Sequence, residues 1–269
     1  MDMQYIKKDK GKVISLWCPV HRQGCVSTNT AFLTSLFSLM AKDGRILVLS
    51  NDTMYNVQGI LSDEINDGLS FLYTLASTGN LKKEEDFSVY TKNINLNLEL
   101  LGNSFKEELV INNLSKEINV IIEKAKDIYD FIFVDVAAGT RNKTSINILK
   151  NSDFILFNLP QDFNIINRFS LEDEKLYLPF FKEKETLINI SNYINYKHFP
   201  KRKIEKILKQ KVSIISNNEF VHKAIMDKDV LGFLEDEIKY GDKKDIEILS
   251  ELEYIYGKII DSIGGAYDE

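Results

Sequence analysis

Short runs of apolar residues recur along this chain, and polar or turn residues bound each of them. Such runs cover 13–17, 45–49, 131–134, 153–158, 186–191 and 212–215, while residues 96–101 alternate between apolar and polar positions. Unbroken runs of this length are typical of strands that are buried on both faces. The pattern predicts a mostly parallel, twisted sheet with helices on both faces.

Apolar residues at helical spacing predict the covering helices. One helix is expected to open near Val26, a second spans 110–126, and a third spans 243–263. Residues 53–75 mix turn residues with one further helix. We therefore expect a single three-layer α/β domain over residues 1–269, with a leader at 1–11 and a C-terminal helix at 241–265. Ligands of such folds bind at the carboxyl ends of the strands.

The first strand leads into a loop and a helix through the segment KVISLWCPVHRQGCVSTN, residues 12–29. A strand, a loop of this length and a helix N-terminus form the architecture of a phosphate-binding loop, because the backbone N–H groups and the helix dipole favour an anion there. We call residues 18–25 the candidate phosphate loop. The alternative is an ordinary helix start with Ser27 or Thr28 as N-cap.

A second chemical signal lies at 130–139, which reads DFIFVDVAAG. An apolar strand that ends in Asp135 and is followed by small residues can present a carboxylate to a magnesium-bound water or to an attacking water. The alternative role for Asp135 is to cap the next helix. Asp52 follows the second apolar run in the same way, and its alternative role is that of a turn residue.

Composition narrows the function classes. The chain has 269 residues and a net charge of −6, which argues against general coating of nucleic acid but permits a local basic patch. Cys18 and Cys25 are the only cysteines, with no histidine cluster beside them, so we expect two reduced thiols and no zinc site. No run has the length of a membrane span, so we expect a soluble, cytoplasmic protein.

The order of these segments resembles the ParA/MinD superfamily of deviant-Walker P-loop ATPases. The family loop KGGxGKT[ST] aligns with Arg22, Gln23, Gly24, Cys25, Val26, Ser27, Thr28 and Asn29. Gly24 and Thr28 match, Arg22 stands at the family's signature lysine, and Ser27 replaces the phosphate-binding lysine. Segment 129–139 resembles the family's YDfIiiD segment and the small-residue turn after it, and Asp52 keeps the second acid of a DxD pattern.

The resemblance implies a nucleotide site. ATP and Mg²⁺ are the expected cofactors, with Asp52 and Asp135 in catalytic roles, Thr28 and Asp135 near the metal, and the residues from Arg22 to Asn29 around the phosphates. The family commonly reads adenine with an asparagine at the end of the strand at 184–194. Asn192 fits that position best, and Asn189 is the competitor.

Three functions follow from the resemblance. The SLWCPVHRQG opening is similar to the TadZ/CpaE branch, which implies a homodimeric positioning protein that recruits a pilus or secretion machine and hydrolyses ATP weakly or not at all. A DNA-partition ATPase is the second, because seven of the fifteen residues in 197–211 are Lys or Arg. A solvated helix face also explains this segment. The third is a scaffold that no longer binds nucleotide.

Overall fold

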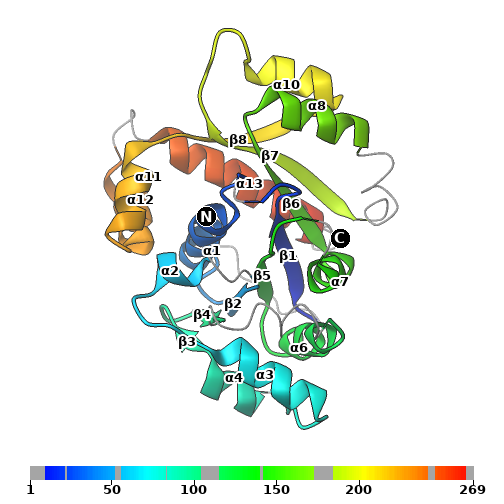
Figure 1. The fold of residues 1–269 in the computed structure, drawn as a ribbon. Helices are drawn as coiled ribbons and strands as arrows, with labels where there is room; N and C mark the ends of the chain where they lie inside the picture. Colours follow the sequence, from blue (N-terminus) through cyan, green and yellow to red (C-terminus); the bar gives the residue numbers. More distant parts are fainter. Residues whose placement is uncertain are drawn as a thin grey trace.

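A computed structural model describes residues 10–21, 23–51, 56–82, 84–103, 115–139, 142–172, 184–241 and 246–264. Within these residues the strands form one eight-stranded sheet in the order β3-β4-β2-β5-β1-β6-β7-β8 (Figure 1). The strands are β1 (Lys12–Trp17), β2 (Ile46–Ser50), β3 (Lys92–Asn93), β4 (Leu98–Leu101), β5 (Phe131–Asp135), β6 (Phe154–Pro160), β7 (Glu185–Tyr193) and β8 (Val212–Ser216).

Every strand pair in this sheet is parallel except that of β3 with β4. The predicted strands and the predicted α/β fold class are therefore confirmed. The short antiparallel β3 was not predicted, because two residues carry no detectable apolar pattern.

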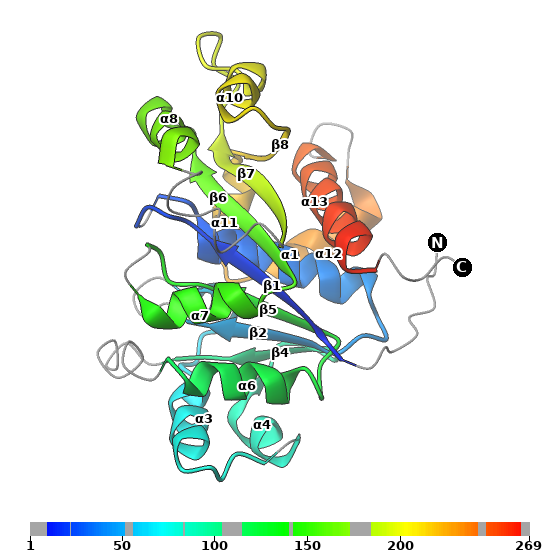
Figure 2. The ribbon, with the colours of Figure 1, turned by 90° about the vertical axis from the view of Figure 1, so that its right-hand side faces the viewer.

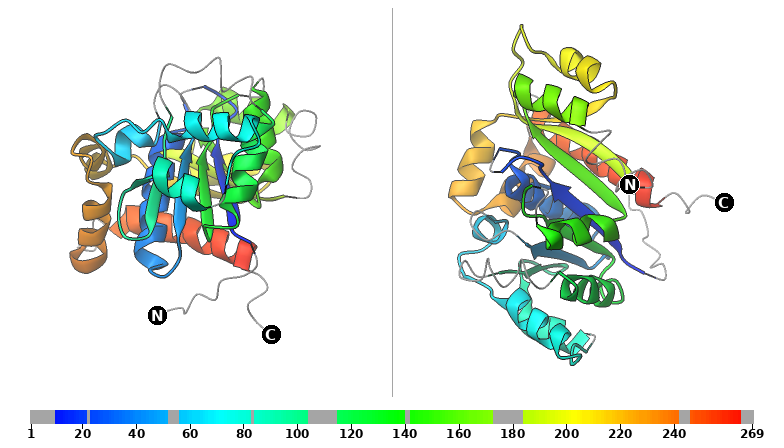
Figure 3. Two further views of the ribbon diagram at one scale, coloured as in Figure 1. Left: turned by 90° about the horizontal axis from the view of Figure 1, so that it is seen from below. Right: turned by 45° about the vertical axis from the view of Figure 1, so that its right-hand side comes forward.

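Helices cover both faces of the sheet (Figures 1 and 2). They are α1 (Val26–Met40), α2 (Gln58–Leu61), α3 (Gly68–Ser77), α4 (Glu84–Tyr90), α6 (Glu117–Ala125), α7 (Lys143–Asn151), α8 (Phe163–Glu172), α10 (Lys201–Leu208), α11 (Glu219–Met226), α12 (Val230–Tyr240) and α13 (Ile246–Gly264). One face carries α1, α11, α12 and α13, and the other carries α3, α6, α7, α8 and α10 (Figure 3).

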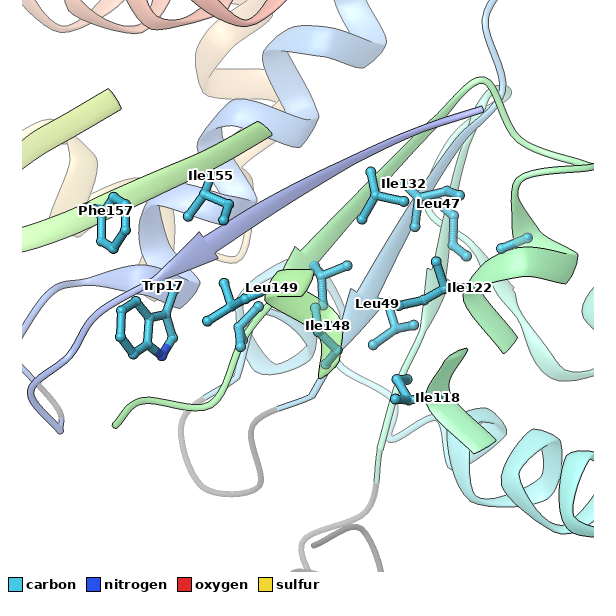
Figure 4. Close-up of a cluster of buried hydrophobic side chains, with 14 of the residues drawn as sticks. Trp17, Leu47, Leu49, Ile118, Ile122, Ile132, Ile148, Leu149, Ile155 and Phe157 are labelled. Atoms are coloured by element: carbon cyan, nitrogen blue, oxygen red, sulfur yellow. The ribbon is translucent and has the colours of Figure 1, made fainter. Parts of the chain in front are cut away.

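The core on the α6 and α7 side joins the sheet to helices that are distant in sequence (Figure 4). Trp17 at the end of β1 is 1% exposed and packs edge-on against Phe157 of β6. Ile118, Ile121 and Ile122 of α6 are fully buried, as the helical pattern predicts. Burial of each such side chain contributes about 1.5–3 kcal/mol before the entropy of ordering the chain is subtracted.

On the opposite face, the aromatic ring of Phe37 fixes α1 against the sheet and against α13. Its centroid lies 4.8 Å from that of Phe133 on β5 and 4.5 Å from that of Tyr256 on α13. Helix α1 is buried along most of its length. Its N-terminus therefore has a fixed position beside the strand ends.

Two predicted elements differ from the structure in their bounds. The strand expected at 96–101 begins only at Leu98, because Asn95 forms a turn in which its Oδ1 accepts hydrogen bonds from the backbone N–H groups of Asn97 and Leu98. The helix expected at 110–126 begins at Glu117, after a turn at Ser115 and Lys116, and residues 110–114 of the prediction lie outside the described residues. Most of the predicted leader, residues 1–9, also lies outside them.

The C-terminal part of the chain forms α13, close to the predicted helix at 241–265. Among the helices of the described ranges, α13 included, none is both long enough and apolar enough to cross a membrane.

Candidate functional site

The carboxyl ends of β1, β2 and β5 lie side by side, and Asp135 is at their centre. Asp135 is level with Leu16 of β1 and with Ser50 of β2. Its side chain is fully buried, and its Oδ2 accepts a 2.9 Å hydrogen bond from the backbone N–H of Val57. The alternative role of capping the next helix is wrong, because Asn142 caps α7.

The candidate phosphate loop runs from this sheet edge to the start of α1. The N-cap of α1 is Cys25, in the left-handed conformation at φ 49°, and it makes no side-chain capping bond. Ser27 and Thr28 already lie inside the helix, so the alternative that either is the N-cap is wrong. The N-terminus of α1 therefore faces the strand ends, and the side chain of its N-cap residue, Cys25, does not cap it. Helices that bind anions present their N-termini in the same way.

Gly24 lies in tight contact with the sheet. A Cβ added to it would be 2.5 Å from the backbone oxygen of Asn158 and 2.6 Å from Cβ of Cys18. Only glycine permits this approach of the loop to β6. The sequence match at Gly24 thus has a steric reason in this chain.

The loop also contacts the turn that follows Asp135. The backbone N–H of Gly139 donates a 3.1 Å hydrogen bond to the carbonyl of Cys18. Gly139 has φ 87°, and an added Cβ would lie 2.8 Å from Nε2 of His21. The segments expected to surround the phosphates are therefore adjacent in the fold.

The remaining predicted loop residues divide by exposure. Gln23 is exposed, whereas Cys25, Val26, Ser27 and Thr28 are half-buried and Asn29 is buried. Arg22 and the predicted catalytic Asp52 lie outside the described residues.

The two asparagines proposed to read a base have different surroundings. Asn189 is fully buried and donates from Nδ2 to Oδ1 of Asn158 over 3.1 Å. Asn192 is exposed, adopts the left-handed conformation at φ 51°, and donates from Nδ2 to Sγ of Cys25 over 3.1 Å. Between the two, only Asn192 has a side chain at the surface beside the loop.

Tyr129 and Asp130, part of the sequence match at 129–139, lie at the opposite end of β5 from Asp135. The hydroxyl of Tyr129 donates to Glu99 over 2.6 Å, and Oδ2 of Asp130 accepts from the backbone N–H of Arg45 over 2.8 Å. These two residues therefore fasten strands together and do not face the candidate site.

Sequence reasoning named Asn29 and Asn189 but missed that they belong to a group of buried, mutually bonded polar side chains behind the loop. We call Asn29, Asn158, Asn189, Ser191 and Ser213 the amide–serine network. Asn29 donates from Nδ2 to Oδ1 of Asn158 over 2.6 Å and to Oγ of Ser191 over 2.9 Å. Oγ of Ser213 donates to Oδ1 of Asn189 over 3.1 Å. Polar residues inside otherwise apolar strands were the available signal.

A second buried polar group behaves differently. Ser50 and Asn51 follow each other at the end of β2, and Asn103 lies just beyond the end of β4. All three side chains are at most 1% exposed. Within the described part of the chain, their side-chain polar atoms have no hydrogen-bond partner. Buried polar atoms of this kind are uncommon and call for a water, an ion or a ligand.

Both cysteines are free thiols. Burial raises the pKa of the Cys18 thiol to about 12, and burial also raises the pKa of Cys25.

Among the described residues, no cluster of three or more His, Cys, Asp and Glu side chains could hold a metal. Mg²⁺ does not need such a cluster, since it binds through one or two protein oxygens together with substrate phosphates. The Thr28 hydroxyl and the Asp135 carboxylate are oxygen donors of that kind.

Comparison with known proteins identifies the fold. No model of a known protein family and no curated protein matches the sequence. A ParA family ATPase from Chlorobium tepidum TLS superposes with a TM-score of 0.70, at 15% identity over 93% of this chain and 99% of that one.

Two further solved structures give the same result. The septum site-determining protein MinD of Pyrococcus horikoshii OT3, complexed with Mg-ADP, gives a TM-score of 0.66 at 14% identity over 93% of this chain and 97% of its own. A putative plasmid partition protein of Borrelia burgdorferi B31, bound to AMPPNP, gives 0.62 at 16% identity over 94% and 99%. This chain therefore has the fold of the ParA/MinD ATPases.

Proposed function

We propose that this chain is an ATP-binding, ParA/MinD-like positioning protein that hydrolyses its nucleotide slowly or not at all. The observation that carries the proposal is that buried Asp135 is level with Leu16 at the end of β1, the strand that leads through the candidate phosphate loop into α1, and that the turn after Asp135 bonds to Cys18 of this loop. The MinD structure with Mg-ADP and the partition protein with AMPPNP support ATP with Mg²⁺ as the ligand.

Different residues of this chain would contact the phosphates, the Mg²⁺, the water and the base. The loop backbone and the helix N-terminus attract the phosphates. The Thr28 hydroxyl and the Asp135 carboxylate would hold Mg²⁺, and Arg22 would add charge at the loop. Bound Mg²⁺ neutralises charge that develops on the phosphates. Asp135 and Asp52 would orient water, and Asn192 would lie nearest the base.

Ser27, which replaces the loop lysine, is expected to affect ATP hydrolysis more than ATP binding. In phosphoryl transfer the loop lysine neutralises charge on the β- and γ-phosphates, and a serine carries no charge. By analogy with other preorganised donors, its loss lowers the rate by about 10²–10³. Backbone contacts do not depend on that side chain. Nucleotide binding is therefore expected to outlast hydrolysis.

The test is to restore the charge. We expect Ser27→Lys to tighten ATP binding in calorimetry and to raise phosphate release. Ser27→Gln, which is long but uncharged, is the matched control. Asp135→Ala added to Ser27→Lys should abolish the gain. If a folded Ser27→Lys variant binds ATP no better than Ser27→Gln, the phosphate-loop assignment is wrong.

A nucleotide-held homodimer would mark a cellular site and recruit an envelope machine such as a Tad-type pilus or secretion apparatus, in the cytoplasm. Its support is the segment order together with the SLWCPVHRQG opening. Light scattering after size-exclusion chromatography, with and without Mg²⁺–ATP, measures the dimer. A monomer in both states would count against this function.

DNA partition is the second candidate, and α10 is the observation that favours it. Arg202, Lys203 and Lys206 are exposed on this helix, whereas Ile204 and Leu208 are buried beneath it. We expect a partition protein to bind random duplex DNA with steep salt dependence. A charge reversal of Lys203 and Lys206 should abolish that binding, and Lys258→Glu on α13 is the control.

A scaffold without nucleotide is the third candidate. Its support is Ser27 together with Ser50, which stands where the DxD pattern has its first acid. Calorimetry that detects no ATP binding to either the wild type or Ser27→Lys would favour it.

A further inference from the structure

The amide–serine network reaches the candidate phosphate loop through Ser191 of β7, and the next residue, Asn192, also contacts the loop. Oγ of Ser191 donates a 2.8 Å hydrogen bond to the carbonyl of Gly24, and Nδ2 of Asn192 donates to Sγ of Cys25 over 3.1 Å. The pairing of β7 with β8 shifts register between Ser191 and Tyr193. This irregularity, with Asn192 in the left-handed conformation, lets neighbouring residues of a strand both bond to the same loop.

Helix α1 is joined to the same point from the other side. Asn29 donates from Nδ2 to Oγ of Ser191 over 2.9 Å. Ser191 is 2% exposed, so its hydroxyl is buried. The Ser191 hydroxyl thus accepts a hydrogen bond from Asn29 in α1 and donates one to Gly24, the residue just before the N-cap.

We propose that Ser191 and Asn192 are positioning residues that hold Gly24 and Cys25 of the candidate phosphate loop in the conformation seen here before any ligand arrives. The inference rests on the proposed function only in calling this loop the nucleotide site. Loops that a ligand must order weaken binding, because the entropy of ordering is subtracted from the affinity. This chain lacks the loop lysine, so a backbone that is already ordered contributes a larger share of the affinity for nucleotide.

Ser213 provides a matched control. It is 1% exposed, lies on the neighbouring strand β8, and donates within the same network, to Asn189. Among the described residues, no hydrogen bond joins Ser213 to the loop. Ser191→Ala and Ser213→Ala therefore both remove a buried hydroxyl, and only the first removes a hydrogen bond to the loop.

Cys25 provides the probe. It is the N-cap residue and is half-buried, whereas Cys18 is 1% exposed. Burial raises the pKa of the Cys25 thiol, so release of the loop into water lowers that pKa and increases the thiolate that reacts. A charged aromatic disulfide reagent forms a mixed disulfide with the Cys25 thiolate and releases its own thiolate, which is measured by absorbance.

The experiment follows Cys25 labelling in the full chain without nucleotide, with Cys18→Ala as the common background. We expect Ser191→Ala to react about fivefold to tenfold faster, in line with loss of the buried hydrogen bond that Ser191 donates to the loop. Asn192→Gly, which keeps the left-handed backbone without the amide, should also react faster. Ser213→Ala should match the background, and Ser191→Thr should restore slow labelling.

Equal acceleration in Ser191→Ala and Ser213→Ala would overturn the proposal, because it would show general loosening. No acceleration in Ser191→Ala would also overturn it. Addition of Mg²⁺–ATP separates the two ideas. If ATP slows labelling of the background protein while Ser191→Ala has no effect, the positioning role fails and the nucleotide site stands. If Ser191→Ala accelerates labelling but ATP never protects, the positioning role stands and the proposed function fails.

Discussion

Two groups of polar side chains are buried among the strands of the sheet, and they differ in how many of their polar atoms have hydrogen-bond partners. In the amide–serine network, Oδ1 of Asn158 accepts from both Asn29 and Asn189. In the group formed by Ser50, Asn51 and Asn103, no side-chain polar atom has a partner within the described part of the chain. A buried polar atom without a partner costs about 1–3 kcal/mol. The β6–β8 side is therefore built as a support, and the β2–β4 side retains unused hydrogen-bonding capacity.

The largest expected effect concerns the centre of the satisfied group. Asn158→Ala would leave the amides of Asn29 and Asn189 without their shared acceptor, so we expect a loss of about 3–4 kcal/mol in the free energy of unfolding. Urea denaturation measures it. A loss below about 1 kcal/mol would mean that the network is not the support described.

The second effect concerns the contact between the loop and that support. Gly24→Ala would place a Cβ 2.5 Å from the backbone oxygen of Asn158. We expect a loss of about 2 kcal/mol, typical of overpacking, together with weaker ATP binding. Gly59→Ala is the control, because an added Cβ meets nothing within 4 Å there. Equal stability of the two variants would contradict the close approach.

The third effect has the opposite sign. Asn51→Leu and Asn103→Leu break no side-chain hydrogen bond among the described residues, so we expect the double variant to be more stable by about 1 kcal/mol. The melting temperature, by calorimetry, measures this. A destabilisation as large as that of Asn158→Ala would show that the two groups do not differ.

The smallest effect depends on pH. Glu251 of α13 accepts from the backbone N–H of Ser216 over 2.8 Å and from its hydroxyl over 2.6 Å, at the end of β8. Burial raises the pKa of Glu251. The folded state therefore binds this proton more tightly than the unfolded state, and stability falls as pH rises from the ordinary glutamate pKa to the raised one.

Glu251→Gln keeps an acceptor and a donor toward Ser216 but cannot titrate. We expect the free energy of unfolding of the wild type to decrease relative to this variant between acidic and neutral pH. Denaturation at several pH values measures the difference. A constant difference across that range would contradict the raised pKa.

The sequence alone determined the sheet and the chemistry that it could carry. Apolar runs specify buried strands because every residue in them faces a helix layer, and the segment order was enough to predict the ParA/MinD fold. Asp135 was predicted as a site residue because it ends an apolar strand and is followed by small residues. The residue that replaces the loop lysine, Ser27, was also visible in the sequence alone.

Only the tertiary structure decided which buried polar residues bond to one another behind the candidate site and which have no hydrogen-bond partner among the described residues. Asn29 and Ser191 are 162 positions apart, and their bond exists because α1 and β7 meet at one sheet edge. The sequence favoured Asn192 over Asn189, but their surroundings came only from the structure: Asn189 is buried and paired with Asn158 and Ser213, whereas Asn192, at the shift in strand register, donates to Cys25. The spacing of apolar residues along the chain indicates which face of an element is buried. Side-chain hydrogen bonds depend on residues that are distant in sequence, so no local pattern predicts them.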